Sequence, residues 1–107
     1  MINNHSLPIK LAKDTLDTGI LKFPGKIAID STGSRLAVSD TGNHRILLVD
    51  PTTGIVNAKV GGKTGAGMKD GGYGEVMLNA PQGVTWHGEY LFVADTENHV
   101  IRKVTSN

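Results

Sequence analysis

Short runs in which apolar and polar residues alternate cover much of the chain between residues 27 and 104. Alternation with a period of two predicts β-strands that are buried on one face. The runs recur about every nine residues, and clusters of Gly, Pro, Asp, Asn, Ser and Thr separate them, as is typical of tight turns. The predicted strands lie at residues 27–30, 35–39, 46–49, 56–60, 83–87, 90–95 and 100–104.

Three segments depart from simple alternation. Residues 46–49 form a continuous apolar run, which is typical of a strand covered on both faces. Residues 7–11 alternate weakly, and Pro8 favours either an edge strand or the start of a strand for this segment. A helix over residues 9–17 is the alternative, although the apolar spacing fits it poorly. Residues 75–78 could form one helical turn within the Gly-rich stretch that follows the fourth of these strands.

A polar motif stands between two predicted strands and occurs twice. Its two examples begin at Asp40 and Asp95, an offset of 95 − 40 = 55 residues. The prolines that precede the repeats, Pro24 and Pro81, are 81 − 24 = 57 residues apart. The second repeat therefore has a shorter first turn, a change that surface hairpins tolerate. The motif reads Asp40-Thr41-Gly42-Asn43-His44-Arg45-Ile46 and then Asp95-Thr96-Glu97-Asn98-His99-Val100-Ile101.

The composition supports an all-β domain and excludes several chemistries. Glycine, with 14 residues, is frequent, and it is unfavourable inside helices. The absence of cysteine excludes disulfides and thiolate sites. A net charge of +1 gives no electrostatic footprint for nucleic acid or an anionic membrane. No apolar run approaches the roughly 20 residues that span a bilayer, and the first residues do not resemble a signal peptide, so a cytoplasmic protein is expected.

A meander of four short strands has two faces, and one sheet alone cannot bury both. Radial stacking, as in the blades of a β-propeller, lets each sheet cover its neighbours. The sequence holds about one and three-quarter blades, whereas closed rings have about 4–8. We therefore expect a fragment of a larger propeller, or a piece that self-associates through its open blade faces. The expected parts are residues 1–20, an N-terminal segment with an edge strand; 21–60, the first repeat; 61–77, a Gly-rich inter-blade loop; and 78–107, a second repeat that stops before its fourth strand.

The two repeats resemble the NHL repeat. The resemblance rests on Pro24 and Pro81, an apolar strand, and the Asp-Thr-x-Asn-His motif followed by Ile46 or Ile101. The sequence is similar to the branch of the family in which a thioredoxin-like domain precedes the propeller, although that domain and its cysteine motif are absent here. The resemblance implies NHL blades that serve as a non-catalytic scaffold for protein binding. The implied partners are another protein or further blades of the same propeller, and neither a membrane nor nucleic acid is expected.

Two alternative functions stay open at this level. One is a part in a thioredoxin-fused protein whose redox or enzymatic activity lies elsewhere in the full chain. The other is RNA binding, as in some NHL proteins, through a basic rim, although nearby acidic residues favour a mixed solvated surface. No Ser-His-Asp set, carboxylate pair or metal-ligand cluster stands out, so no catalytic, cofactor-binding or metal-binding residue is predicted. The basic residues are Lys59, Lys63, Lys69, Arg102 and Lys103.

The motif residues are predicted to be structural, because a repeat copies the residues that fold it. Their carboxylates and amides can accept or donate hydrogen bonds within a tight turn, for example to backbone N–H groups two residues on. The two histidines are predicted to make a turn-locking or inter-strand hydrogen bond. The predicted structural set is Pro24, Asp40, Thr41, Asn43 and His44, with Pro81, Asp95, Thr96, Asn98 and His99.

Two further features invite a functional interpretation and favour a structural one. Gly61-Gly62-Lys63-Thr64 contains part of a phosphate-binding loop, but Asn57 occupies the position where that motif needs its first glycine. Trp86 alternates with Val84 on a predicted strand, which favours packing in the core or between blades over stacking on a ligand.

Overall fold

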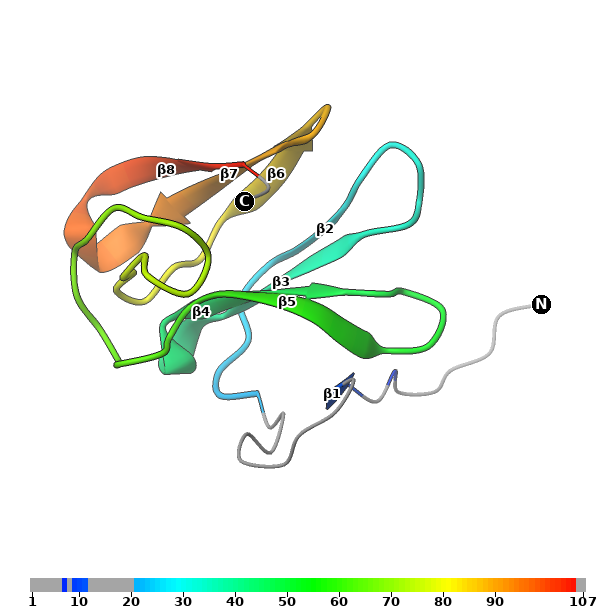
Figure 1. Cartoon of the computed structure of the whole chain (residues 1–107), viewed down its shortest axis with the longest axis horizontal. Helices are drawn as coiled ribbons and strands as arrows, with labels where there is room; N and C mark the ends of the chain where they lie inside the picture. Colours follow the sequence, from blue (N-terminus) through cyan, green and yellow to red (C-terminus); the bar gives the residue numbers. More distant parts are fainter. Residues whose placement is uncertain (1–6, 8, 12–20, 106–107) are drawn as a thin grey trace.

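The computed structural model describes residues 7, 9–11 and 21–105 and shows an all-β protein of two sheets (Figure 1). This confirms the predicted fold class. The first sheet has the strand order β1-β5-β4-β3-β2, and the second has the order β6-β7-β8. The strands are β1 (Lys10–Leu11), β2 (Ile27–Ile29), β3 (Leu36–Asp40), β4 (Arg45–Val49), β5 (Ile55–Gly61), β6 (Val84–His87), β7 (Tyr90–Asp95) and β8 (Val100–Val104).

Strands β2 to β8 lie where the alternation predicts them. Consecutive strands pair antiparallel from β2 to β5 and from β6 to β8, which gives one four-stranded and one three-stranded meander. β1 pairs in parallel with β5 and forms the edge of the first sheet, as expected for the 7–11 segment. Pro8 and residues 12–20 of the predicted N-terminal segment lie outside the described residues. No helix of the described part of the chain is long and apolar enough to cross a membrane.

The continuous apolar run of β4 is buried on both faces, as predicted. Ile46 and Leu48 point to one side of the first sheet and belong to the larger core. Leu47 and Val49 point to the other side and pack with Val38, Val56 and partly buried residues from the N-terminal side. Every residue of β4 is buried, so this strand is the centre of the first sheet.

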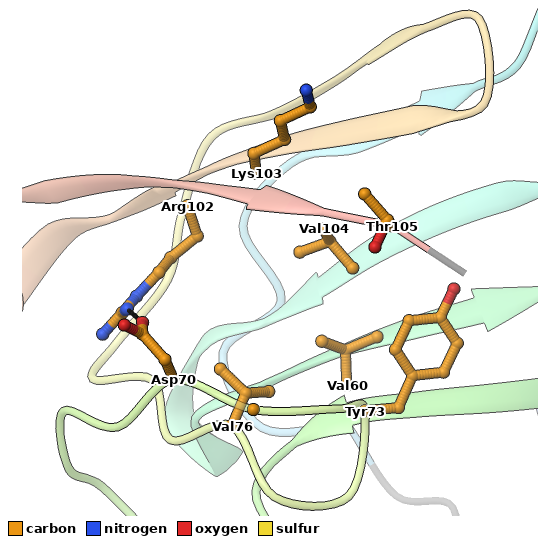
Figure 2. Close-up of a pocket in the computed structure, with 9 residues that line it drawn as sticks. Val60, Asp70, Tyr73, Val76, Arg102, Lys103, Val104 and Thr105 are labelled. Carbon is orange, nitrogen blue, oxygen red and sulfur yellow. Dashed lines mark hydrogen bonds and ion pairs between the residues drawn. The ribbon is translucent and has the colours of Figure 1, made fainter. Parts of the chain in front are cut away.

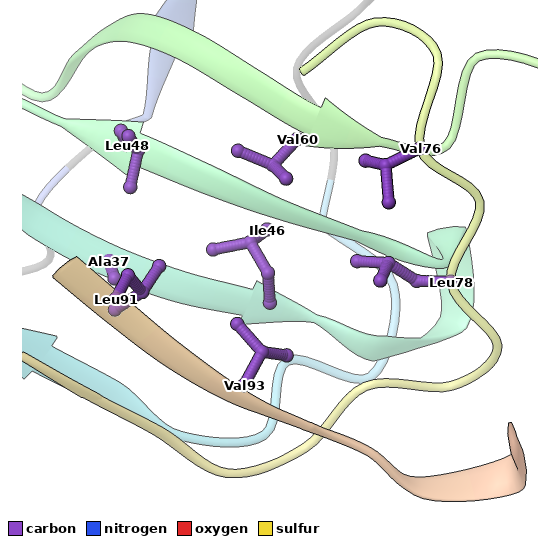
Figure 3. Close-up of a cluster of buried hydrophobic side chains, with 8 residues drawn as sticks. All are labelled: Ala37, Ile46, Leu48, Val60, Val76, Leu78, Leu91 and Val93. Atoms are coloured by element: carbon purple, nitrogen blue, oxygen red, sulfur yellow. The ribbon is translucent and has the colours of Figure 1, made fainter. Parts of the chain in front are cut away.

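The larger core lies between the two sheets, which stack as successive blades (Figure 3). We call β2–β5 the first blade and β6–β8 the second. The first blade contributes its back surface, the face that carries Ile46 and Val60, and the second contributes its front surface, the face that carries Leu91 and Val93. β6 is the strand of the second blade that lies against β2 and β3. The cluster is completed by Ala37, Leu48, Val76 and Leu78, with Val84, Trp86 and Val104 partly buried against it.

Two local predictions were wrong. The regular alternation over residues 56–60 predicts Val56 on the same face as Ala58 and Val60. The register between β4 and β5 shifts at this point, so Val56 packs on the opposite face. A β-bulge has this effect because its extra residue reverses the alternation. Residues 75–78 do not form a helical turn: the turn closes earlier, where the Val76 N–H donates to the Gly72 carbonyl oxygen, and Met77 then pairs with Lys69 in an isolated antiparallel bridge.

Candidate functional site

Asp40 is the centre of a buried polar network in the first blade. Its Oδ1 atom accepts a hydrogen bond from the backbone N–H of Lys22 at 2.7 Å. Its Oδ2 atom accepts from the Asn43 side-chain amide at 2.9 Å and from the Arg45 guanidinium at 2.7 Å. The carboxylate has no exposed surface, so the network ties the segment before β2 to the turn between β3 and β4.

Asp95 repeats this network in the second blade. Its Oδ1 atom accepts from the Asn79 N–H at 2.7 Å, and its Oδ2 atom accepts from the Asn98 amide at 2.8 Å. Arg102 donates to the same Oδ2 atom at 3.1 Å. Because both carboxylates make equivalent contacts, the repeated aspartates have the same structural task in each blade.

Neither aspartate accepts the hydrogen bond from the backbone N–H two residues on that the sequence suggests. Short 3₁₀ turns, η1 (Thr41–Asn43) and η2 (Thr96–Asn98), follow them, and neither turn has a side-chain cap. Asp40 is the last residue of β3 and pairs with Arg45 across the sheet, so its side chain points to the front surface rather than along the turn. The carboxylate therefore reaches back to the start of the blade instead of bonding the N–H two residues on.

Sequence reasoning missed the two arginines as partners of these carboxylates. Arg45 is the residue directly opposite Asp40 in the β3–β4 pair, whereas Val100 is the residue opposite Asp95. Arg102 lies two positions further along β8, on the same face, and reaches Asp95 diagonally. A search for an arginine on the matching face, rather than at the matching position, would have found it.

The histidine after each 3₁₀ turn adopts a left-handed backbone, with φ of 57° at both His44 and His99. The Nδ1 atom of His44 accepts a hydrogen bond from the Ala80 N–H at 3.0 Å, so a neutral ring carries its proton on Nε2. This bond joins the two blades rather than two strands of one turn. Among the described residues, the side chain of His99 has no such partner.

Two hydroxyl groups join the blades beside His44. The Thr41 hydroxyl donates to the Pro81 carbonyl oxygen at 2.7 Å, and the Ser39 hydroxyl donates to that of Gln82 at 2.6 Å. Trp86 adds a third contact, because its indole N–H donates to the Ala28 carbonyl oxygen at 3.0 Å. The Arg35 guanidinium lies 4.3 Å from the centre of the Trp86 ring. The prediction that Trp86 packs between blades is confirmed.

A pocket of about 220 Å³ lies beside the outer edge of β8 (Figure 2). Val60, Tyr73 and Val76 form its apolar wall, and Arg102 and Asp70 pair at its other end. One terminal nitrogen of Arg102, Nη2, is buried with no hydrogen-bond partner among the described residues. In the first blade, β5 occupies the equivalent place beside β4. The pocket therefore lies where the second blade has one strand fewer among the described residues.

The hairpin between β2 and β3 holds another buried carboxylate, Asp30. Its oxygens accept from the Arg35 guanidinium at 2.9 Å, from the Arg35 and Ser34 N–H groups, and from the Thr32 hydroxyl. The Arg35 guanidinium, opposed in part by burial, holds the pKa of Asp30 well below its usual range. These contacts fix the six-residue loop, residues 30–35, that joins β2 to β3. Asp30 had not been singled out from the sequence alone.

Asp40, Asn43, Asp95 and Asn98 all make side-chain hydrogen bonds within the fold. The described residues contain no group of three or more His, Cys, Asp or Glu side chains that could hold a metal ion. In the Gly61–Gly62 segment both glycines have positive φ, and no helix follows, so the geometry does not form a phosphate-binding loop. In the basic rim, Arg102 pairs with Asp70 and Asp95, and the Lys103 ammonium lies 4.0 Å from the Tyr90 ring centre.

Comparisons with known proteins agree with this geometry. No protein-family model matches the chain. Over 103 residues, 96% of its length, the chain is 47% identical to NHL repeat-containing protein 2 of Gallus gallus, and over the same share it is 45% identical to the protein of that name from Homo sapiens. It is also 37% identical to Protein SUPPRESSOR OF QUENCHING 1, chloroplastic, of Arabidopsis thaliana, in an alignment that covers 97% of the chain. The chain spans only 14% of the two animal proteins and 10% of the plant protein.

Two stacked meanders, each built around the same Asp–Asn–Arg network, are consecutive blades of a partial β-propeller. With relatives at 45–47% identity along nearly its whole length, the chain belongs to the NHL repeat family. It is most simply described as a segment similar to part of NHL repeat-containing protein 2.

Proposed function

We propose that this chain is a non-catalytic protein-interaction scaffold built from consecutive NHL blades. One observation carries the proposal: the same polar network occurs in both blades, with both carboxylates fully buried. A catalytic carboxylate must touch the reacting group. Among the described residues, the hydrogen-bond partners of Asp40 and Asp95 all belong to their own blade or to the segment that leads into it. We therefore assign the two aspartates to the stability of each blade rather than to a reaction.

A longer propeller would supply the strand that the second blade lacks beside β8. In the first blade β5 runs beside β4, while the outer edge of β8 has no neighbouring strand among the described residues. A further strand beside β8 would cover the pocket formed by Val60 and Arg102 to Thr105. Because the chain spans 14% of its animal relatives, the remaining strands and blades would come from the rest of a longer protein.

The hairpin tips are the surface that we propose for a protein partner. The turns at residues 30–35, 50–54 and 88–89 lie at the same end of their antiparallel sheets. Loops that a rigid sheet positions are a common place for binding residues. Thr52 and Glu89 are exposed at two of these tips, and the tips carry no part of the buried networks around Asp40 and Asp95.

The experiment compares substitutions at the hairpin tips with a substitution in the buried network around Asp40. The chain is immobilised, and proteins from an extract of the source cells that cross-link to it are quantified by mass spectrometry. Glu89→Lys or Thr52→Lys should reduce the cross-linked partner without changing the melting midpoint. Asp40→Asn should lower the midpoint and reduce the partner only in proportion to the unfolded fraction. A substrate turnover that Asp40→Asn abolishes while the midpoint is unchanged would overturn the scaffold assignment.

A further inference from the structure

The Gly-rich loop of residues 61–77 joins the two blades and is tied to the second blade by two polar contacts. The Asn98 side-chain amide donates to the Gly67 carbonyl oxygen at 2.7 Å. The Arg102 guanidinium pairs with the Asp70 carboxylate, as Figure 2 shows. Lys69, the residue before Asp70, belongs to the isolated bridge that holds the loop together. The Asp70–Arg102 pair therefore helps to fix the loop against the second blade.

Asp70 differs from the other described aspartates in its exposure. Its side chain is 92% exposed, whereas those of Asp30, Asp40 and Asp95 are at most 2% exposed. The carboxylate of Asp50 accepts hydrogen bonds from the backbone of its own turn. Among the described residues, Arg102 is the single partner of the Asp70 carboxylate. Water can therefore reach this side chain, and only one contact restrains it.

The residue after Asp70 has to be a glycine. Gly71 has a φ of 155°, which residues with a side chain rarely adopt. A Cβ atom at this position would lie 2.8 Å from the Cβ atom of Glu75. Among the described residues, the Gly71 N–H donates to no carbonyl oxygen, whereas the N–H groups of Lys69 and Val76 do. The fold thus leaves the Gly71 nitrogen without the cover that a side chain would give.

An exposed aspartate followed by glycine can rearrange without any other reagent than water. The Gly71 backbone nitrogen attacks the Cγ atom of Asp70, and its proton leaves with the carboxyl hydroxyl group as water. The new N–Cγ bond closes a five-membered succinimide ring. Water then opens the ring. Cleavage of the N–Cγ bond restores aspartate, whereas cleavage at the α-carbonyl gives isoaspartate, in which the main chain runs through Cγ and the α-carboxylate is free.

The sequence confines this chemistry to one position. Asp70-Gly71 is the single Asp-Gly step in the chain, and no asparagine precedes a glycine. Every other aspartate precedes threonine, serine or proline. A side chain on the following residue hinders the attack of its nitrogen, and proline has no N–H to lose. Exposure and the following residue therefore both select Asp70.

We propose that Asp70 is a site of isoaspartate formation and that its conversion releases the Gly-rich loop from the second blade. An isoaspartyl residue adds one methylene group to the main chain and carries its free carboxylate directly on Cα. That carboxylate has a shorter reach, so Arg102 would lose its partner at Nη1. Its Nη2 atom already has none among the described residues. The proposal goes beyond the scaffold function, because it depends on no binding partner.

Methylation of the aged chain tests the first half of the proposal. The chain is kept for several weeks at neutral pH and physiological temperature. It is then treated with a protein isoaspartate methyltransferase and radioactive S-adenosylmethionine, and peptide mapping locates the label. The wild type should be labelled at residue 70. Asp70→Glu is the matched control: it keeps the charge, but it would have to close a six-membered ring, so the label should be lost. Asp70→Asn forms the same succinimide with loss of ammonia and should be labelled faster than the wild type.

Limited proteolysis tests the release of the loop. Trypsin should cut after Lys63, an exposed residue of the same loop, faster in the aged wild type than in the fresh one. Aged Asp70→Glu should be cut at the rate of its own fresh sample. Circular dichroism confirms that each sample is folded. An aged wild type without label at residue 70 overturns the proposal, and label without faster cleavage overturns the release of the loop. Neither result affects the scaffold assignment, which the hairpin variants test separately.

Discussion

The Asp40 carboxylate and the Arg45 guanidinium form an ion pair inside the first blade, with Oδ2 and Nε 2.7 Å apart. The two residues lie directly opposite each other in the β3–β4 pair. Asp40 is completely buried and Arg45 nearly so. A buried pair adds little stability over an apolar pair of the same volume, but removal of one partner leaves an uncompensated charge. This pair is therefore a point where a single substitution should unfold the blade.

Arg45→Met should lower the free energy of unfolding by about 3–5 kcal/mol, because the Asp40 carboxylate would stay buried without its cation. Urea titration followed by circular dichroism measures the change. Lys22→Ala is the matched control: Lys22 contributes its backbone N–H to the same carboxylate, and alanine keeps that N–H. The control should stay within about 0.5 kcal/mol of the wild type. An Arg45→Met variant as stable as the control would show that the ion pair does not hold the blade.

His44→Asn and His99→Asn separate the inter-blade bond from the backbone conformation. Both histidines have φ of 57°, a conformation that asparagine tolerates. Asparagine is too short to reproduce the imidazole bond from His44 to the Ala80 N–H. His44→Asn should therefore cost about 1 kcal/mol, and His99→Asn should be nearly neutral in the monomer. Equal losses at the two positions, measured by urea titration at low protein concentration, would contradict a role for the His44 bond.

Asp30 should make stability fall at acid pH. Its pKa is lowered in the folded state, chiefly by the Arg35 guanidinium, so the unfolded state binds a proton more readily. The stabilisation is present above the ordinary Asp pKa of about 4 and is lost as pH falls towards the folded value. The melting midpoint of the wild type should thus drop below about pH 4 more steeply than that of Asp30→Asn. Glu89→Gln, at an exposed position, should leave the wild-type profile unchanged, and parallel profiles for all three proteins would contradict the assignment.

Most of the strand positions could be predicted because they depend on local pattern. Alternation is set by which side chains face the core, so β2 to β8 lie where the apolar residues recur. The continuous run of β4 likewise predicts its burial on both faces. The bulge near Val56 escaped prediction, because Val56, Ala58 and Val60 read as one regular alternation in the sequence.

The polar network could be predicted only in part, because its bonds are long-range. The Asp40 carboxylate accepts from an N–H 18 residues earlier in the chain, and that of Asp95 accepts from one 16 residues earlier. Local turn rules cannot show such partners. The arginines come from different strand positions in the two blades, so aligning the repeats hides their common role. The inter-blade bond of His44 depends on how two sheets stack, which repeat spacing alone does not give.

Trp86 reports whether the two blades unfold together. Its indole N–H donates to the Ala28 carbonyl oxygen in the first blade, and Arg35 of that blade lies over its ring. Trp86→Phe keeps an aromatic ring but removes the donor, so it should cost about 1–2 kcal/mol, as measured by circular dichroism. Because Trp86 is the single tryptophan and contacts the first blade, its fluorescence in the wild type reports on the environment between the two blades. Coincident midpoints from fluorescence and circular dichroism are expected if the interface couples the blades, whereas an earlier fluorescence transition would mean that the second blade detaches first.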